Sequence, residues 1–211
     1  MLRRSHFCFV LAGLAGVLPG ALRAQGRDTQ IGFELGYSHA QFSPVGTPAA
    51  TQDGSIIAGF LSRRIAGPLS AQIELMLSRR GGGLTAPDAT GTFLGTAQLV
   101  YIEIPVLARI TVPVGRLRPV LLGGGSFAVS VGCELQVEGS DNLEQQRCDG
   151  DSATVALAGS DFNAIIGGGL EYTLRSATLR LELRRIVGLR NLAPGQDLKN
   201  RVWAVLVGIT F

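Results

Sequence analysis

Large apolar residues alternate with smaller, partly polar ones over residues 201–211 of the chain. The large residues of this segment share one parity: Trp203, Val205, Val207, Ile209 and Phe211. The opposite parity holds smaller and partly polar residues: Val202, Ala204, Leu206, Gly208 and Thr210. An alternation of period two that ends on an aromatic residue is typical of a transmembrane β-strand whose apolar face meets lipid. We therefore expect a final membrane-spanning strand, in which Trp203 and Phe211 form a C-terminal insertion signal.

The same strand-like pattern recurs along the rest of the chain. The segments that carry it are approximately 29–41, 54–65, 68–80, 95–112, 117–132, 154–173, 176–190 and 200–211. Tight connections, at 65–68, 112–116 and 174–176, alternate with longer ones such as 81–94. Membrane barrels have short periplasmic turns and longer extracellular loops. The sequence therefore predicts an all-β fold, an eight-stranded antiparallel up-and-down transmembrane β-barrel with both chain ends on the periplasmic side.

Charged residues within these segments fall on the face opposite the aliphatic residues. In one segment, for example, Leu181 and Leu183 alternate with Arg180, Glu182 and Arg184. If the aliphatic face meets lipid, the charged face points into a lumen that is just wide enough for side chains. The predicted interior charge network consists of Glu34, Glu74, Glu103, Arg109, Glu171, Arg180, Glu182 and Arg184. Arg118 also points inward.

Buried charges require partners, and the two signs are nearly balanced in this set. We therefore interpret the network as a structural plug, with Glu103 and Arg184 at its centre. A proton or ion pathway and acid–base catalysis by paired carboxylates are alternative interpretations.

The amino terminus has the pattern of a secretory signal. Two arginines follow Met1, residues 7–18 are apolar, and Ala24 precedes Gln25. We expect a signal peptide over residues 1–24 and a barrel domain over residues 25–211. Removing Arg3, Arg4 and Arg23 from the 19 basic residues would leave 16, which equals the 16 acidic ones. A neutral mature chain argues against nucleic acid as a partner.

Two cysteines remain after the expected signal, Cys133 and Cys148, and they flank a polar segment. In an exported protein, a disulfide bond that closes this loop is the natural interpretation. A zinc site would need more ligands, and no cofactor site is expected. Because His39 is the one histidine left after the signal, a catalytic Ser-His-Asp set is not expected either.

Several smaller features receive structural interpretations. Glycine triplets at 81–83, 123–125 and 167–169 lack the Gly-Lys-Ser/Thr ending and the following helix of a phosphate loop, so we expect barrel bends. Pro105 lies inside a predicted strand and is expected to mark a bulge. Four arginines are expected at the extracellular ends of strands, as a solvated rim or as ligands for lipopolysaccharide phosphates. They are Arg79, Arg80, Arg190 and Arg201.

Five blocks of sequence resemble the outer-membrane β-barrel domain family that includes the PorT-like proteins. They are 72–81 (QIELMLSRRG), 101–107 (YIEIPVL), 123–125 (GGG), 161–171 (DFNAIIGGGLE) and 180–189 (RLELRRIVGL). The resemblance implies an eight-stranded barrel in the outer membrane of a Gram-negative bacterium, and it supplies no catalytic set.

From this resemblance and the patterns above we expect an integral outer-membrane protein with a structural or surface-interaction role, and not an enzyme. The alternative is a small transport pore or an accessory component of a secretion machine. The expected partners are outer-membrane lipid, lipopolysaccharide and, during insertion, the barrel-assembly machinery. We expect the protein to be a monomer.

Overall fold

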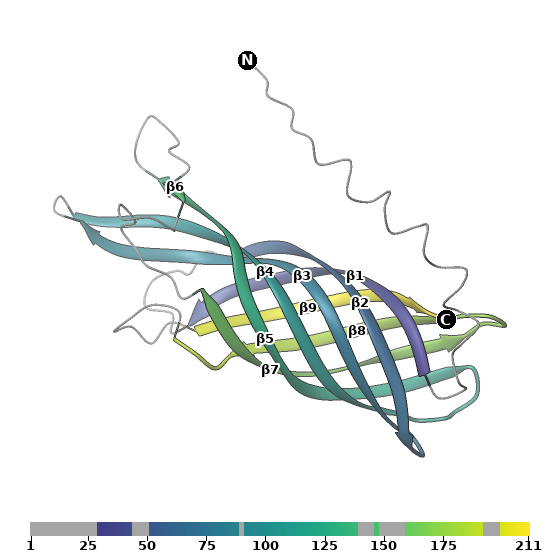
Figure 1. Cartoon of the computed structure of the whole chain (residues 1–211). Coiled ribbons are helices and arrows are strands. Elements are labelled where there is room, and N and C mark those ends of the chain that lie inside the picture. Colours follow the sequence, from purple (N-terminus) through teal and green to yellow (C-terminus); the bar gives the residue numbers. More distant parts are fainter. Residues whose placement is uncertain (1–28, 44–50, 89–90, 139–145, 148–158, 192–198) are drawn as a thin grey trace.

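The computed structural model describes residues 29–43, 51–88, 91–138, 146–147, 159–191 and 199–211 as a closed antiparallel β-barrel (Figure 1). The barrel strands are β1 (Thr29–Ser43), β2 (Gln52–Ala66), β3 (Leu69–Asp88), β4 (Gly91–Thr111), β5 (Leu117–Glu138), β7 (Ser160–Thr173), β8 (Thr178–Gly188) and β9 (Lys199–Thr210). A two-residue strand, β6 (Gln146–Arg147), pairs with the far end of β5. The expected signal peptide lies outside the described residues.

Each barrel strand pairs with its neighbour in the chain, and β9 pairs with β1 to close the cylinder. The closing register places Phe33 opposite Ile209 and Gly36 opposite Leu206. The start of β1 and the end of β9 lie at the same end as the tight turns after β2, β4 and β7 (Figure 1). Because membrane barrels have short turns on the periplasmic side, this is the periplasmic end. The predicted fold class is confirmed.

Burial alternates along β8 and β9 with the parity that the sequence predicted. In β9, Val202 and Ala204 are buried while Trp203 and Val207 are about half exposed. The same holds in β8, where Leu181 is exposed between buried charged neighbours. The exposed side chains along the middle of the strands are aliphatic or aromatic, so the outer wall of the barrel is an apolar band and its inner wall carries the charges. A soluble sheet has the opposite arrangement.

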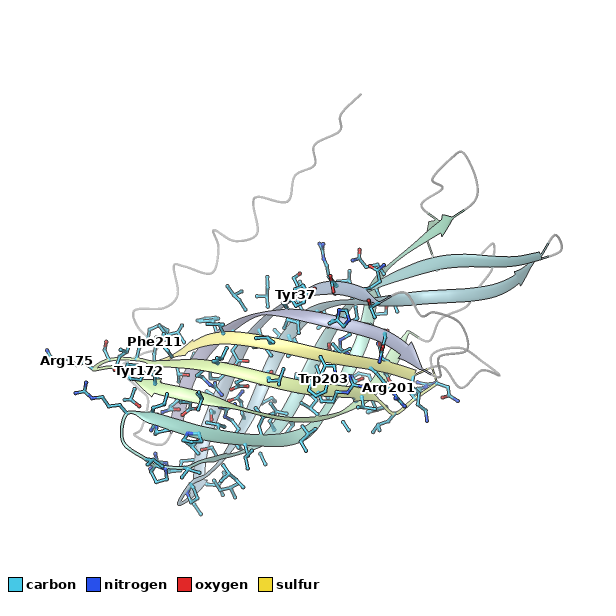
Figure 2. The ribbon with its side chains drawn as sticks, turned by 180° about the vertical axis from the view of Figure 1, so that it is seen from behind. Tyr37, Tyr172, Arg175, Arg201, Trp203 and Phe211 are labelled. Atoms are coloured by element: carbon cyan, nitrogen blue, oxygen red, sulfur yellow. The ribbon has the colours of Figure 1, made fainter. Side chains whose placement is uncertain are left out.

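Aromatic side chains mark the two edges of the apolar band (Figure 2). Tyr172 and Phe211 lie near the periplasmic end, and Trp203 lies near the extracellular end beside Arg201. The guanidinium carbon of Arg185 lies 4.9 Å from the centroid of the Trp203 ring. Trp203 and Phe211 are eight positions apart in a tilted strand, and this offset corresponds to about 20 Å along the barrel axis. This spacing suits the hydrocarbon layer of an outer membrane.

The segment 81–94, predicted to be a long loop, is instead a continuation of the β3–β4 hairpin. The two strands pair from Leu69 opposite Ile110 up to Asp88 opposite Gly91. The glycine triplet at 81–83 does not interrupt the pairing of β3 with β4. The paired residues beyond it include Thr85 and Phe93, whose residue types favour strands. The hairpin and the end of β5 extend beyond the rest of the barrel on the extracellular side (Figure 1).

Pro105 does not mark a bulge, so that prediction was wrong. The β3–β4 register is the same on both sides of it, with Ile73 opposite Val106 and Met76 opposite Glu103. Pairing between these two points is simply interrupted, because proline has no N–H to donate. The register shift in β4 lies earlier in the chain, between Val100 and Tyr101, in the pairing of β4 with β5.

Candidate functional site

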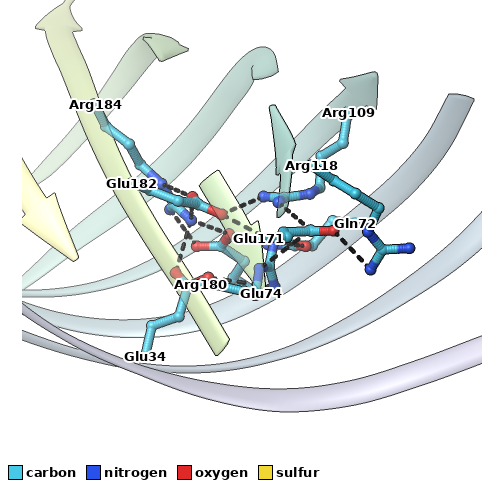
Figure 3. Close-up of polar contacts among 9 residues, drawn as sticks. All are labelled: Glu34, Gln72, Glu74, Arg109, Arg118, Glu171, Arg180, Glu182 and Arg184. Atoms are coloured by element: carbon cyan, nitrogen blue, oxygen red, sulfur yellow. Dashed lines mark hydrogen bonds and ion pairs between the residues drawn. The ribbon is translucent and has the colours of Figure 1, made fainter. Parts of the chain in front are cut away.

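The candidate site is the charged interior of the barrel at the level of the apolar band (Figure 3). Strand β8 supplies three of its members, Arg180, Glu182 and Arg184, because alternate residues of a strand point to the same face. The other charged members come from β1, β3, β4, β5 and β7: Glu34, Glu74, Arg109, Arg118 and Glu171. Residues that are far apart in the chain therefore meet across the lumen.

Arg184 is fully buried and contacts three carboxylates. Its Nη2 lies 2.7 Å from Oε2 of Glu34 and 2.7 Å from Oε2 of Glu182. Its Nη1 lies 2.8 Å from Oε2 of Glu74. One guanidinium thus joins strands β1, β3 and β8 through charge-assisted hydrogen bonds, which are among the strongest in proteins.

Arg109 and Arg180 continue the network towards the periplasmic end. Arg109 donates to Glu182 at 2.6 Å and to Glu171 at 3.0 Å. Arg180 lies 3.0 Å from Glu182 and 3.3 Å from Glu34. Its guanidinium carbon is also 4.2 Å from the centroid of the Phe60 ring, which adds a cation–π contact.

Gln72 connects the two halves of the network as a neutral bridge. Its amide nitrogen donates to Glu74 at 2.6 Å, and its amide oxygen accepts from Arg180 at 2.9 Å. At the periplasmic margin, Nη2 of Arg118 lies 3.3 Å from Oε2 of Glu171. The connected set therefore holds four arginines and four glutamates, so its formal charge is zero.

Glycines create the space that these charged side chains occupy. On the inner face, Gly169 is opposite Glu182 and Gly167 is opposite Arg184. Gly208 lies between Glu34 on β1 and Arg180 on β8. A Cβ atom on Gly169 would overlap the carbonyl oxygen of Leu181 and press on the Glu182 side chain. The triplet at 167–169 was interpreted from sequence as a bend, and the structure shows that Gly167 and Gly169 make room for the network.

Glu103 does not lie at the centre of this network, which corrects the sequence prediction. It is buried nearer the extracellular end, where it accepts hydrogen bonds from Ser78, Arg80 and Ser126. Among the described residues, no ion pair joins it to the set around Arg184. Strand tilt is the reason: a mid-strand position in one strand does not share its height with a mid-strand position in another.

Arg80 was expected at the solvated rim, and this expectation was also wrong. Its side chain is 1% exposed and forms the ion pair with Glu103. Because β3 continues past Arg80 to Asp88, the residue lies inside the lumen and not at a strand end. The neighbouring Arg79 has the opposite parity and is exposed on the outside. Arg190 and Arg201 are exposed as well, and Arg190 donates to Ser160 at 3.0 Å.

His39 lies on the outer wall at the extracellular margin, where the structure gives it a partner that sequence analysis missed. Its Nδ1 is 2.8 Å from Oδ1 of Asp53 on the neighbouring strand. Hydrogen bonds from the Tyr37 hydroxyl and then from His39 hold the pKa of Asp53 below its ordinary value. Within the described ranges, no hydroxyl or thiol hydrogen-bonds to His39, so the pair lacks a nucleophile.

A cavity of about 370 Å³ lies at the periplasmic mouth of the lumen, directly against the network. Its walls include Arg109, Arg118, Glu171 and Arg180, together with Arg64 from β2. Sequence analysis did not predict this cavity. The cysteine prediction is not tested, because Cys148 and the side chain of Cys133 lie outside the described residues. In the part of the chain that is described, no three His, Cys, Asp or Glu side chains gather as metal ligands.

A closed barrel with an apolar outer wall and a charged interior defines the class of integral outer-membrane barrels, and comparison with known proteins supplies the family. The sequence model of one protein family, the outer membrane protein beta-barrel domain, matches residues 23–193. The chain therefore belongs to that family and is located in the outer membrane. No helix in the described residues is long and apolar enough to span a membrane. Comparison with curated proteins gave no match.

Several solved structures resemble the chain. One is the attachment invasion locus protein Ail of Yersinia pestis, solved in complex with the heparin analogue sucrose octasulfate. It is 11% identical to this chain with a TM-score of 0.46, and the match covers 87% of this chain and 99% of Ail. Neisserial surface protein A is 12% identical with a TM-score of 0.47, over 85% and 95%. The outer membrane enzyme PagL is 10% identical with a TM-score of 0.43, over 83% and 97%. At these values no ligand or activity transfers to this chain.

Proposed function

We propose that this protein is a closed, non-conducting outer-membrane barrel with a structural or surface-interaction role. The observation that carries the proposal is the charge network around Arg184. The lumen of an eight-stranded barrel is just wide enough for side chains, and here three carboxylates and two guanidiniums lie in direct contact across it. A permeating ion would have to separate these pairs in a site from which water is excluded, and that separation is costly.

The charge balance of the network supports the same role. A selective pore is lined by an excess of one sign of charge, whereas the connected set here is neutral. Its charged groups also pair with one another; Glu182, for example, contacts Arg109, Arg180 and Arg184. We interpret this arrangement as a polar core that holds the strands of the barrel together, and we expect no catalysis from it.

The surface-interaction part of the proposal rests on the extracellular extension of β3, β4 and β5. Among the described residues, β2 pairs with β3 only as far as Ser78, and the carbonyl of Arg79 still accepts a hydrogen bond from Ser38. From Gly81 to Asp88, no described strand pairs with this edge of β3, so it presents an open backbone edge. An open edge is a template for pairing with another chain. On the outer wall, exposed Arg79 and Arg201 lie at the height expected for lipopolysaccharide phosphates, and guanidinium groups suit phosphate. A monomer assembled by the barrel-assembly machinery fits this picture.

Potassium flux in proteoliposomes tests the closed state. We expect vesicles with the folded protein to retain potassium as well as protein-free vesicles do. A sustained leak that scales with the amount of folded protein would favour the alternative role, a small transport pore.

Photocrosslinking on intact cells tests the surface role. A crosslinking amino acid at Thr85, in the extracellular hairpin, should trap a surface component, whereas one at Arg175, in a periplasmic turn, should not trap the same component. Identical products from both positions, or none from Thr85, would contradict a surface-interaction role. A screen with ester and phosphoester substrates tests the absence of catalysis.

A further inference from the structure

The cavity at the periplasmic mouth has an excess of positive charge that the network does not explain. Four arginines and one glutamate line it: Arg64, Arg109, Arg118, Arg180 and Glu171. The deeper carboxylates Glu34 and Glu182 compensate Arg109 and Arg180 from below. Arg64 has no ion pair among the described residues, and Arg118 shares its partner Glu171 with two other guanidiniums.

Among the described residues that line the cavity, Glu171 is the one carboxylate, and three arginines converge on it. Its Oε1 lies 3.0 Å from Arg109 and 3.7 Å from Arg180, and its Oε2 lies 3.3 Å from Arg118. One carboxylate therefore serves three guanidiniums at the mouth, and Arg64 adds a fourth cation, so the charge at this level is unbalanced.

We propose that this cavity is a binding site for an oxyanion, a phosphate or carboxylate group, that enters from the periplasm. Guanidinium groups donate to such anions in a fork geometry, and the remaining walls add one amide and three hydroxyl side chains. A volume of about 370 Å³ accommodates a phosphate group together with its attached moiety. The network lies against the inner end of the cavity. Anion binding would be a role beyond the plug, although four charged residues of the cavity also belong to the network.

Titration of inorganic phosphate and of succinate into the folded, full-length protein tests the site. The protein would be held in a nonionic detergent without chloride, and binding would be followed by calorimetry and by phosphorus NMR. Saturable binding of either anion supports the proposal, and the tighter of the two identifies a phosphate or a carboxylate ligand. If neither anion binds saturably at millimolar concentration, the proposal is wrong.

Substitutions locate the binding. Arg64→Gln with Arg118→Gln removes two donors, yet leaves Glu171 paired with Arg109 and Arg180, so the barrel should remain folded. We expect the dissociation constant to rise at least about tenfold, because the loss of even one of the two charge-assisted hydrogen bonds would produce that change. The control Arg175→Gln removes one positive charge from the same end, outside the cavity, and should change the constant by less than about twofold.

Glu171→Gln provides a test of opposite sign. Glu171 competes with the anion for the same guanidiniums, so its neutralisation should tighten binding while the other variant weakens it. Equal weakening by the Arg64/Arg118 variant and by Arg175→Gln would show diffuse attraction to a basic rim, and would overturn the proposal.

Discussion

Replacement of Arg184 by methionine tests the interior network most sharply. The substitution keeps a long side chain but removes the cation that contacts Glu34, Glu74 and Glu182. Glu34 keeps Arg180, and Glu182 keeps Arg109 and Arg180. Among the described residues, Glu74 keeps only the amide of Gln72. The main cost is therefore one buried carboxylate without a cation, and we expect the free energy of unfolding to fall by about 3–5 kcal/mol.

The assay is urea unfolding in lipid vesicles. Trp203 is the single tryptophan of the chain and lies at the lipid interface, so its fluorescence reports the loss of the folded barrel. Arg175→Met, in an exposed turn, is the matched control and should change stability by less than about 0.5 kcal/mol.

A double variant separates charge from packing. Glu74→Gln in the Arg184→Met background removes the uncompensated charge, and it should recover about 1–3 kcal/mol of the loss. If Arg184→Met costs less than about 1 kcal/mol, or if the second substitution adds to the loss, the network does not hold the barrel together in the way described.

The remaining predictions concern the outer wall, the second ion pair and the cysteines. Leu181→Arg places a charge on the lipid-facing side of β8 and should cost about 2–4 kcal/mol for folding into bilayers if the residue lies at the midplane; a near-neutral result would reverse the face assignment. Glu103→Gln leaves buried Arg80 without its carboxylate and should cost about 3–5 kcal/mol, measured by the same urea unfolding, with Arg79→Gln on the outside as a nearly neutral control. Cys133 and Cys148 should form a disulfide, and mass spectrometry of fresh outer membranes that finds two free thiols would contradict this. Their replacement by serine should leave the heat-modifiable band of the folded barrel on SDS gels unchanged.

The fold was predictable because a barrel strand carries its signal locally. The alternation of Arg180, Leu181, Glu182, Leu183 and Arg184 fixes which side chains point inward, whatever the neighbouring strands are. The structure agrees with this pattern, because the two leucines are exposed and the three charged residues are buried. The ends of β3 and β4 were not predictable in the same way, because a glycine triplet is compatible with a loop, a bend or a continued ladder.

The partners inside the lumen could not be predicted, because they depend on register and tilt. Arg184 and Glu34 are 150 positions apart, and their contact requires the closing pair of strands β9 and β1. The same lack of register led to Glu103 at the wrong height, whereas Arg80 was placed at the rim because the predicted strand ended too early. One signal was available and was missed: inward-facing Gly167, Gly169 and Gly208 leave room for large charged neighbours.

Planar-bilayer recording of the parent protein tests the central claim, that the network closes the lumen. The account predicts a conductance that stays at the baseline of the protein-free membrane across a range of voltages, with the folded state verified by heat-modifiability on SDS gels. Steady ion conduction by the parent, with a selectivity that changes in Arg184→Met, would contradict the plug and establish a pore in its place.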